Sequence, residues 1–181
     1  MAEPAERLMT VAEFLLWDDG SDTRYELVDG APVAMAPPSG AHGTILGNAA
    51  GEIRARLRHR PPCRVQVEAG IRINDTRQWQ ADLAVTCAPP APGPVAEPVL
   101  IVEVLSPSTR AIDLARKLLD YKDLPGVREI WLIDSERRWV QAWRREPEGW
   151  HGRDHIGGAG LASPMLGDEV ALDELYLNTG L

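Results

Sequence analysis

The chain has 181 residues, of which 44% are hydrophobic and 25% charged, with a formal net charge of −8 and a pI near 5.0. This length and balance fit one soluble globular domain with its own hydrophobic core. Proteins that bind duplexes usually carry a basic surface, so the acidic balance counts against tight, non-specific binding of nucleic acid. It does not exclude an enzyme whose acidic site takes up a cation before an anion approaches.

The sequence contains no recognisable membrane span or export signal. No segment approaches the roughly 20 apolar residues of a membrane helix, and the first residues lack a basic region followed by an apolar run. The chain has only two cysteines, Cys63 and Cys87, without CxxC spacing or a nearby histidine cluster, so we expect neither a zinc site nor a disulfide framework. These features predict a cytoplasmic protein that does not bind membranes.

The N-terminal residues predict a short helix followed by a β-hairpin. Thr10 and Glu13 have the spacing of a capping box, which marks a helix start. Two short strand-like segments then flank Asp29-Gly30, and this dipeptide is a strong signal for a two-residue hairpin turn. We therefore expect a helix that begins near residue 10 and a hairpin over about 24–35.

The rest of the chain alternates between helical and strand periodicity. Helices are expected at about 41–60 and 110–124, and strands at about 64–73, 79–86, 98–106, 128–134 and 138–144. This order packs most simply as a mixed α/β sheet with helices on its faces. The strand 98–106, the helix after it and the strand 128–134 would form a βαβ crossover.

Two carboxylates interrupt strands that are otherwise apolar. Asp82 lies in the strand 79–86, and Glu103 lies in the strand 98–106. A buried carboxylate needs a cation, a hydrogen-bond network or a raised pKa, because its desolvation is costly. Two such groups on successive strands suggest a site for a hard metal ion with oxygen ligands. The alternative is a pair of structural carboxylates that bind arginine side chains or backbone N–H groups.

Lysine is rare in this chain, which contains 17 arginines and only two lysines. Both lysines, Lys117 and Lys122, lie in the predicted helix 110–124. Two carboxylates that share Mg²⁺, with a lysine nearby, form an arrangement suited to hydrolysis of a phosphodiester. If the chemistry requires a lysine, one of these two residues must supply it.

Several motifs together resemble a known family over about residues 10–145. They are Tyr25-Glu26-Leu27-Val28-Asp29-Gly30, Pro37-Pro38-Ser39 with His42, the strand with Asp82, Val102-Glu103-Val104-Leu105-Ser106-Pro107-Ser108-Thr109, then Asp113, Lys117 and Tyr121, and Val127 to Asp134. This pattern resembles the Uma-two family of putative restriction endonucleases, a branch of the PD-(D/E)XK nuclease superfamily. The segment from Glu103 to Thr109, with the downstream Asp113, Lys117 and Tyr121, is its most specific part.

The resemblance implies one restriction-endonuclease-like domain over residues 1–181, with a mixed β-sheet core flanked by helices and an N-terminal helix and β-hairpin. It implies Mg²⁺-dependent hydrolysis of nucleic acid, DNA above all, with Mn²⁺ as a possible substitute for Mg²⁺. Asp82 and Glu103 would be the metal ligands. Glu26 would assist the metal or the water, Lys117 would orient water or stabilise charge, and Tyr121 would support the site.

Two positions depart from the superfamily pattern. Ala81-Asp82 stands where Pro-Asp is usual, and the Asp is the chemical requirement. Leu105 stands two residues after Glu103, where a lysine is expected. The resemblance suggests that Lys117 takes over this role from the following helix.

Simpler interpretations remain open for these residues. On a regular helix, Asp113, Lys117 and Tyr121 form a stripe away from the apolar residues, so an exposed Asp113–Lys117 pair explains them equally well. Glu26 is either part of the site or a solvent-facing strand residue. The whole protein is either a nuclease, an inactive binding or assembly module with the same fold, or a hydrolase of small phosphoesters.

Hydrolysis of both strands of a duplex is easiest for a two-fold dimer, so we expect a homodimer. The predicted hairpin 128–144 carries Trp131, Trp139 and Trp143, which fit either a core or a dimer surface.

Overall fold

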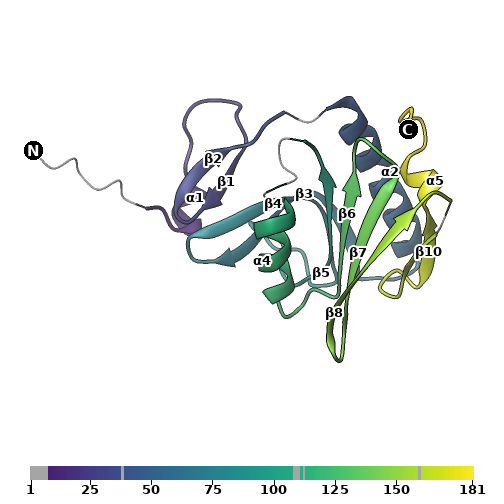
Figure 1. Cartoon of the computed structure of the whole chain (residues 1–181). Coiled ribbons are helices and arrows are strands. Elements are labelled where there is room, and N and C mark those ends of the chain that lie inside the picture. The colour runs from purple at the N-terminus through teal and green to yellow at the C-terminus, as the bar shows by residue number, and fades with distance from the viewer. Residues whose placement is uncertain (1–7, 38, 108–110, 112, 159) are drawn as a thin grey trace, which may run out of the picture.

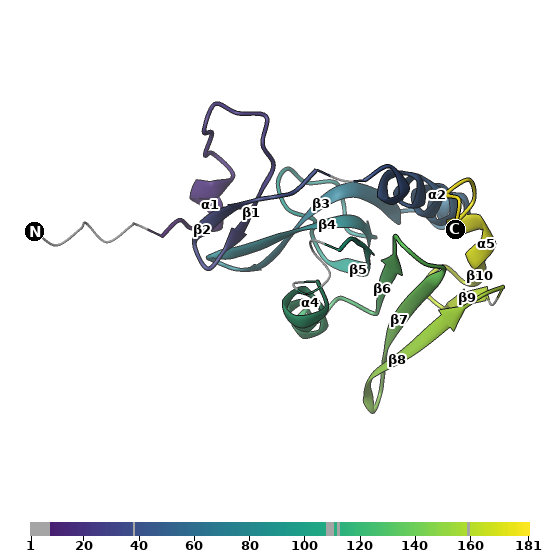
Figure 2. The ribbon, with the colours of Figure 1, turned by 45° about the horizontal axis from the view of Figure 1, so that its top comes forward.

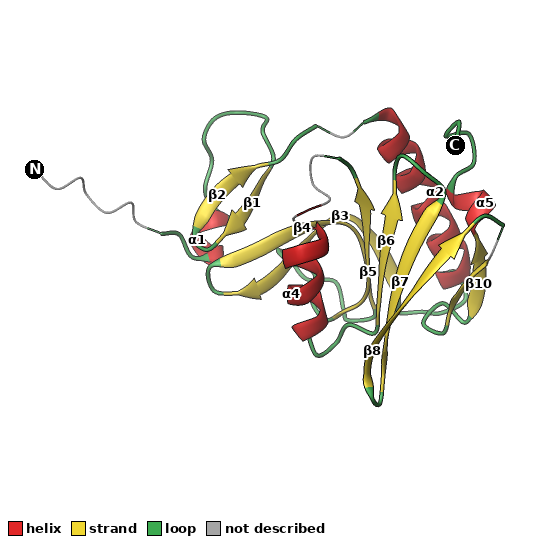
Figure 3. Ribbon diagram, viewed as in Figure 1, coloured by secondary structure: helices red, strands yellow, loops and turns green. Residues whose placement is uncertain are grey.

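The computed structural model describes residues 8–181 except 38, 108–110, 112 and 159. The strands are β1 (Tyr25–Val28), β2 (Ala31–Ala34), β3 (Arg64–Asn74), β4 (Arg77–Thr86), β5 (Pro98–Leu105), β6 (Glu129–Asp134), β7 (Trp139–Glu146), β8 (Gly149–Ile156), β9 (Gly160–Ser163) and β10 (Asp168–Ala171). The helices are α1 (Val11–Phe14), α2 (Gly40–Leu57), a π-helical turn η1 (Asp113–Lys117), α4 (Leu118–Asp123) and α5 (Leu172–Leu175). Figures 1 and 3 show their arrangement.

The predicted mixed sheet with flanking helices is confirmed. Its strands follow the order β2-β1-β4-β5-β6-β7-β8, and β3 pairs with β4 on the other side of that strand. The strands β5 and β6 run parallel, as the predicted crossover requires, whereas β4 and β5 run antiparallel. A separate pair, β9 and β10, carries the chain to α5 at its C-terminal end (Figure 1).

Helices cover both faces of the sheet (Figure 2). On one face, α2 and α5 pack on Leu100, Val102 and Val104 of β5. On the other face, α4 packs on Ile101 and Leu105 of the same strand. Because side chains alternate across a strand, both faces of β5 must be apolar, which explains its continuous hydrophobic sequence. Glu103 alternates with Val102 and Val104, so it belongs to the face that α4 covers.

Local signals in the N-terminal part predict the structure well. Thr10 and Glu13 form the expected capping box at the start of α1. Asp29 and Gly30 adopt φ values of 52° and 87°, as a type I′ hairpin turn requires, and β1 pairs with β2 around them. A Cβ at Gly30 would lie 2.6 Å from the Cβ of Leu8, so glycine also permits the close approach of the chain that precedes α1.

The predicted apolar face of the helix after β5 is wrong. Lys117 and Tyr121, which the sequence placed away from the apolar residues, are buried, whereas the apolar Leu119 is 60% exposed. The physical reason is the π-helical turn η1, whose wider turn shifts the angular positions of the residues around it. The expected helix start at residue 110, and the side chain of Asp113, lie outside the described residues.

The expectation that the cysteines would not form a disulfide is also wrong. Cys63 and Cys87 form one, with an S–S distance of 1.92 Å. The register of the β3–β4 ladder explains the pairing, because Arg64 lies opposite Thr86 and the two cysteines flank this pair. The signal was therefore in the strand register and not in the local cysteine spacing.

In the described part of the chain, no helix is long and apolar enough to cross a membrane.

Tyr176 connects the C-terminal end of the chain to the β6–β7 turn. Its hydroxyl accepts a hydrogen bond from the backbone N–H of Trp139 at 3.1 Å and lies 2.7 Å from the carbonyl of Trp139 and 3.0 Å from that of Asp134. Burial raises the pKa of Tyr176 to about 12. The hydroxyl therefore stays protonated and holds these backbone groups together.

We expect Tyr176→Phe to lower the free energy of unfolding by about 1–3 kcal/mol, because it leaves buried backbone groups without a partner. Urea denaturation measures this change. The matched control is Tyr25→Phe, which removes an exposed hydrogen bond to Asp19 and should change stability by less than about 0.5 kcal/mol. Equal effects of the two variants would contradict the role of Tyr176.

Candidate active site

The candidate site lies beside β4, where the neighbouring strands β1 and β5 pair with different parts of one edge of β4. On one side of β4, β1 pairs with it through Leu27 and Gln78, and β5 pairs with it from Leu83 and Val102 onward. Between these points, residues 79–82 have no strand partner on that side. Backbone N–H groups at such a gap need other acceptors, since an unpaired buried donor is costly.

Three carboxylates supply acceptors at this gap. Glu26 of β1 accepts a hydrogen bond from the N–H of Gln80 at 2.9 Å through Oε1. Glu103 of β5 accepts from the N–H of Asp82 at 3.4 Å through Oε2, and Asp82 accepts from the N–H of Val104 at 2.7 Å through Oδ2. Backbone N–H groups therefore bind these carboxylates, as expected if the carboxylates are structural. They also fix the direction of each carboxylate.

Lys117 enters this cluster from the π-helical turn η1. Its Nζ lies 2.8 Å from Oε1 of Glu26 and 3.5 Å from Oε1 of Glu103, and only 5% of the residue is exposed. The alternative of an exposed lysine on the helix surface is therefore wrong. The hydroxyl of Tyr121 in α4 donates to the same Oε1 of Glu103 at 2.6 Å. Both contacts use Oε1, so Oε2 of Glu103 is the oxygen that faces Asp82.

The structure thus brings together all five residues that the sequence placed in the site, namely Glu26, Asp82, Glu103, Lys117 and Tyr121. It adds His42, whose Nε2 lies 3.3 Å from Oδ2 of Asp82. His42 lies in the first turn of α2, where Ser39 accepts from its backbone N–H as the N-cap. Its Nδ1 is buried and makes no hydrogen bond within the described residues. The sequence signal was the motif Pro37-Pro38-Ser39 with His42, to which the resemblance assigned no role.

A cavity of about 60 Å³ opens beside these side chains. Its charged or titratable lining consists of Arg24, His42, Glu68, Asp82, Glu103 and Lys117. The sequence did not assign Arg24 or Glu68 to the site, because neither interrupts an apolar segment. Only strand pairing brings Glu68 of β3 beside the strand that carries Asp82.

The donors at the cavity fit a hard cation. Asp82 and Glu103 offer carboxylate oxygens from neighbouring strands, which is the ligand type that Mg²⁺ and Mn²⁺ prefer. Within the described residues, Oδ1 of Asp82 makes no hydrogen bond. Ligation at that oxygen would therefore displace no existing contact.

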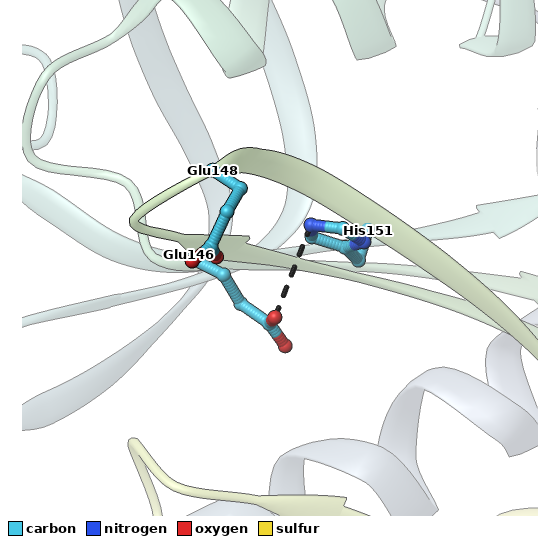
Figure 4. Close-up of side chains that lie close together, drawn as sticks. All are labelled: Glu146, Glu148 and His151. Carbon is cyan, nitrogen blue, oxygen red and sulfur yellow. Dashed lines mark ion pairs between the residues drawn. The ribbon is translucent and has the colours of Figure 1, made fainter.

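A different acidic group lies at the β7–β8 turn (Figure 4). Ligand atoms of Glu146, Glu148 and His151 lie within 4.8 Å of one another, and Nε2 of His151 is 3.9 Å from Oε2 of Glu146. Elsewhere in the described chain, no other three such residues come as close together. All three are exposed, and exposed acidic groups are common without an ion, so this group carries no functional assignment.

We expect Lys117→Met to lower the free energy of unfolding by about 3–5 kcal/mol, since it leaves buried carboxylates without their cation. The matched control is Lys122→Met in α4. The ammonium of Lys122 lies 3.0 Å from the Trp143 ring centroid, and its loss should cost about 1 kcal/mol. Chemical denaturation in the absence of divalent metal compares the two variants. Equal small losses would contradict a buried, charge-paired Lys117.

Comparisons with known proteins agree with this architecture. The crystal structure of "a putative nuclease belonging to DUF820" from Anabaena variabilis superimposes with a TM-score of 0.75 and 19% identity, over 93% of this chain and 97% of that one. At this identity the likeness shows the fold. An "Uncharacterized protein" of Synechocystis sp. is 26% identical over 170 residues, which is 91% of this chain and 89% of the relative.

The family comparison covers most of the molecule. The model of the Uma2 family, described as "Putative restriction endonuclease", matches residues 11–173. This range includes every residue of the candidate site and the helices on both faces of the sheet, except the last two residues of α5. The resemblance inferred from the sequence motifs is therefore confirmed, and the chain belongs to the Uma2 family.

Proposed function

We propose that this protein is a metal-dependent endonuclease that hydrolyses phosphodiester bonds of nucleic acid, DNA above all, at the cavity beside β4 and β5. The nuclease-like fold and the family support a nuclease in general. The observation that carries the proposal is the position of Lys117. Although Leu105 replaces the lysine that usually follows the acidic residue, Lys117 brings an ammonium to 3.5 Å from Glu103.

Asp82 and Glu103 are the proposed ligands of Mg²⁺, and Mn²⁺ is the proposed substitute for it. When bound, the ion supplies a water of lowered pKa and stabilises negative charge on the phosphate. The protein prepares this site before any ion binds. Tyr121 holds Oε1 of Glu103, and the N–H of Val104 holds Oδ2 of Asp82, so both carboxylates have fixed directions.

The other side chains set the charge around the reacting phosphate. Lys117 places a buried positive charge at the wall of the cavity, where it stabilises charge that develops in the transition state. Glu26 orients that ammonium at 2.8 Å and in this way assists the water or the metal. Because Glu26 also binds the N–H of Gln80, the lysine is tied to the backbone of the sheet.

The position of Leu105 explains why the lysine is supplied by the helix. Leu105 is fully buried in the apolar cluster beneath α4, on the same face of β5 as Glu103. A lysine at this position would place an ammonium among apolar side chains. The π-helical turn η1 instead brings Lys117 to the carboxylates from the crossover that follows β5, and such turns occur frequently at functional sites.

An inactive binding or assembly module is the second candidate. One observation favours it, namely that backbone N–H groups already bind Asp82 and Glu103. The carboxylates could then serve the fold without a metal. A third candidate is a hydrolase of small phosphoesters, which the small cavity of about 60 Å³ favours. Cleavage of plasmid DNA compared with a chromogenic phosphodiester separates the three candidates.

Millimolar Mg²⁺ or Mn²⁺ should raise the melting temperature, because an ion that binds only the native state stabilises it by mass action. Asp82→Asn and Glu103→Gln should each remove this shift and abolish cleavage. Each variant should retain most of its stability without metal, since the amide keeps the shape and one acceptor oxygen. The control is Asp75→Asn, which alters an exposed ion pair with Arg72.

Differential scanning fluorimetry and plasmid cleavage, measured on the same preparations, test this expectation. A metal-dependent shift that persists in both variants would place the metal elsewhere. No shift and no cleavage in the unaltered protein would favour the inactive module. A loss of about 3–5 kcal/mol in the metal-free variants would mean that the carboxylates are structural.

The homodimer and the cytoplasmic location remain predictions. Trp131 is fully buried, and Trp139 and Trp143 pack against the cluster under α4, so these rings offer little dimer surface. Among the described strands, β2 and β8 end the sheet order, and the outer edge of β8 is the edge that we propose for the dimer. Light scattering at micromolar concentration should give twice the 19.9 kDa monomer mass, and the monomer mass would contradict the dimer.

A further inference from the structure

An ion pair lies at the mouth of the cavity. Arg24, just before β1, binds Oε1 of Glu68 in β3 through Nη1, and both residues line the cavity with Asp82. Their side chains are 41% and 52% exposed. An ion pair with this exposure contributes little to stability, because water screens it and both side chains lose freedom. The pair can therefore open at low cost.

The backbone at Glu68 is unusual for a strand. Glu68 has a φ of 51°, although the β3–β4 ladder continues through Val67 on one side and Ala69 on the other. A left-handed conformation is unfavourable for a residue with a side chain, and such residues concentrate at functional sites. The side-chain amide of Gln80 donates to the carbonyl of Glu68 and so supports this conformation. The strand thus turns locally at the residue whose carboxylate reaches the cavity.

The charges around the cavity give Arg24 a distinct role. Lys117 is engaged deep in the site by Glu26 and Glu103, and His42 lies against Asp82. Among the described cations of the lining, Arg24 is the one whose partner, Glu68, is exposed to solvent. A phosphodiester that enters the cavity meets three carboxylates, those of Glu68, Asp82 and Glu103.

We propose that Arg24 binds a phosphate of the nucleic acid, and that Glu68 occupies its guanidinium until that phosphate displaces it. Guanidinium groups bind phosphate with two parallel hydrogen bonds, and charge-assisted bonds of this kind are strong. Glu68 then acts as an internal competitor that lowers the affinity for weakly bound anions. This inference rests on the proposed function, because it assigns a substrate contact to the same cavity.

The simpler account is an ordinary surface ion pair. The chain offers a matched comparison in Arg72 of β3 and Asp75 of the turn after it. These residues form an exposed pair, with side chains 54% and 84% exposed, and they do not line the cavity. If Arg24 acts only by general attraction of an anion, Arg72→Gln should have the same effect as Arg24→Gln.

Binding of a short fluorescein-labelled DNA duplex, measured by fluorescence anisotropy with Ca²⁺ in place of Mg²⁺, tests the proposal. Arg24→Gln should weaken binding about tenfold, since it removes a charge-assisted contact. Glu68→Gln should tighten binding severalfold, and this gain should disappear in the Arg24→Gln background, because Glu68 acts through Arg24. Arg72→Gln should change affinity by less than about twofold.

A second probe, bis(p-nitrophenyl) phosphate titrated by calorimetry, separates this inference from the proposed function. If the unaltered protein cleaves DNA but Arg24→Gln binds both probes normally, the inference is wrong and the nuclease stands. A gain from Glu68→Gln that persists without Arg24 also overturns it. If both probes show the Arg24–Glu68 coupling but no phosphodiester is cleaved, the inference stands and the nuclease is wrong. Failure of the unaltered protein to bind either probe overturns both.

Discussion

The candidate site depends on the separation of β1 and β5 along one edge of β4. This separation leaves backbone N–H groups of Gln80 and Asp82 without a strand partner on that edge, and Glu26 and Glu103 accept their hydrogen bonds. The acidic side chains are therefore part of the sheet as well as of the site. Their burial is tolerated because backbone donors, a tyrosine and a lysine bind them. The hydrogen bonds that support the sheet and the proposed chemistry therefore involve the same side chains.

The charged side chains around the cavity form two groups, an inner layer that is buried and an outer layer at the cavity mouth. The inner layer contains Glu103, Lys117 and Tyr121, which are buried, and Glu103 contacts Tyr121 at 2.6 Å and Lys117 at 3.5 Å. The outer layer contains Arg24 and Glu68, which are half exposed. A fixed interior suits the positioning of reacting groups, whereas an exchangeable exterior suits the entry and release of a charged ligand. The net charge of −8 fits a protein that relies on a few placed cations rather than on a basic surface.

The sequence predicts those features that depend on local pattern. The apolar strands, the capping box and the Asp29-Gly30 turn are of this kind, and a carboxylate within an apolar strand marks Asp82 and Glu103 directly. Features that depend on tertiary structure were missed or wrong. The π-helical turn buries Lys117, which a regular helix would have exposed, and strand register pairs Cys63 with Cys87. Arg24 and Glu68 lack any local signal, because each is an ordinary polar residue until the sheet brings them together.

The placement of Lys117 on a helix has a consequence for how this chain can vary. When a lysine follows its acidic partner on the same strand, the alternation of side chains along that strand fixes where the lysine lies relative to the acidic residue. Here the relation passes through the helical segment that follows β5, and removal of one residue within a regular helix rotates the side chains that follow by about 100° around the helix axis. If Lys117 has the proposed role, the length of this helical segment is restricted more strongly than the identities of its exposed residues. An insertion or a deletion before Lys117 should then be harder to tolerate than a substitution.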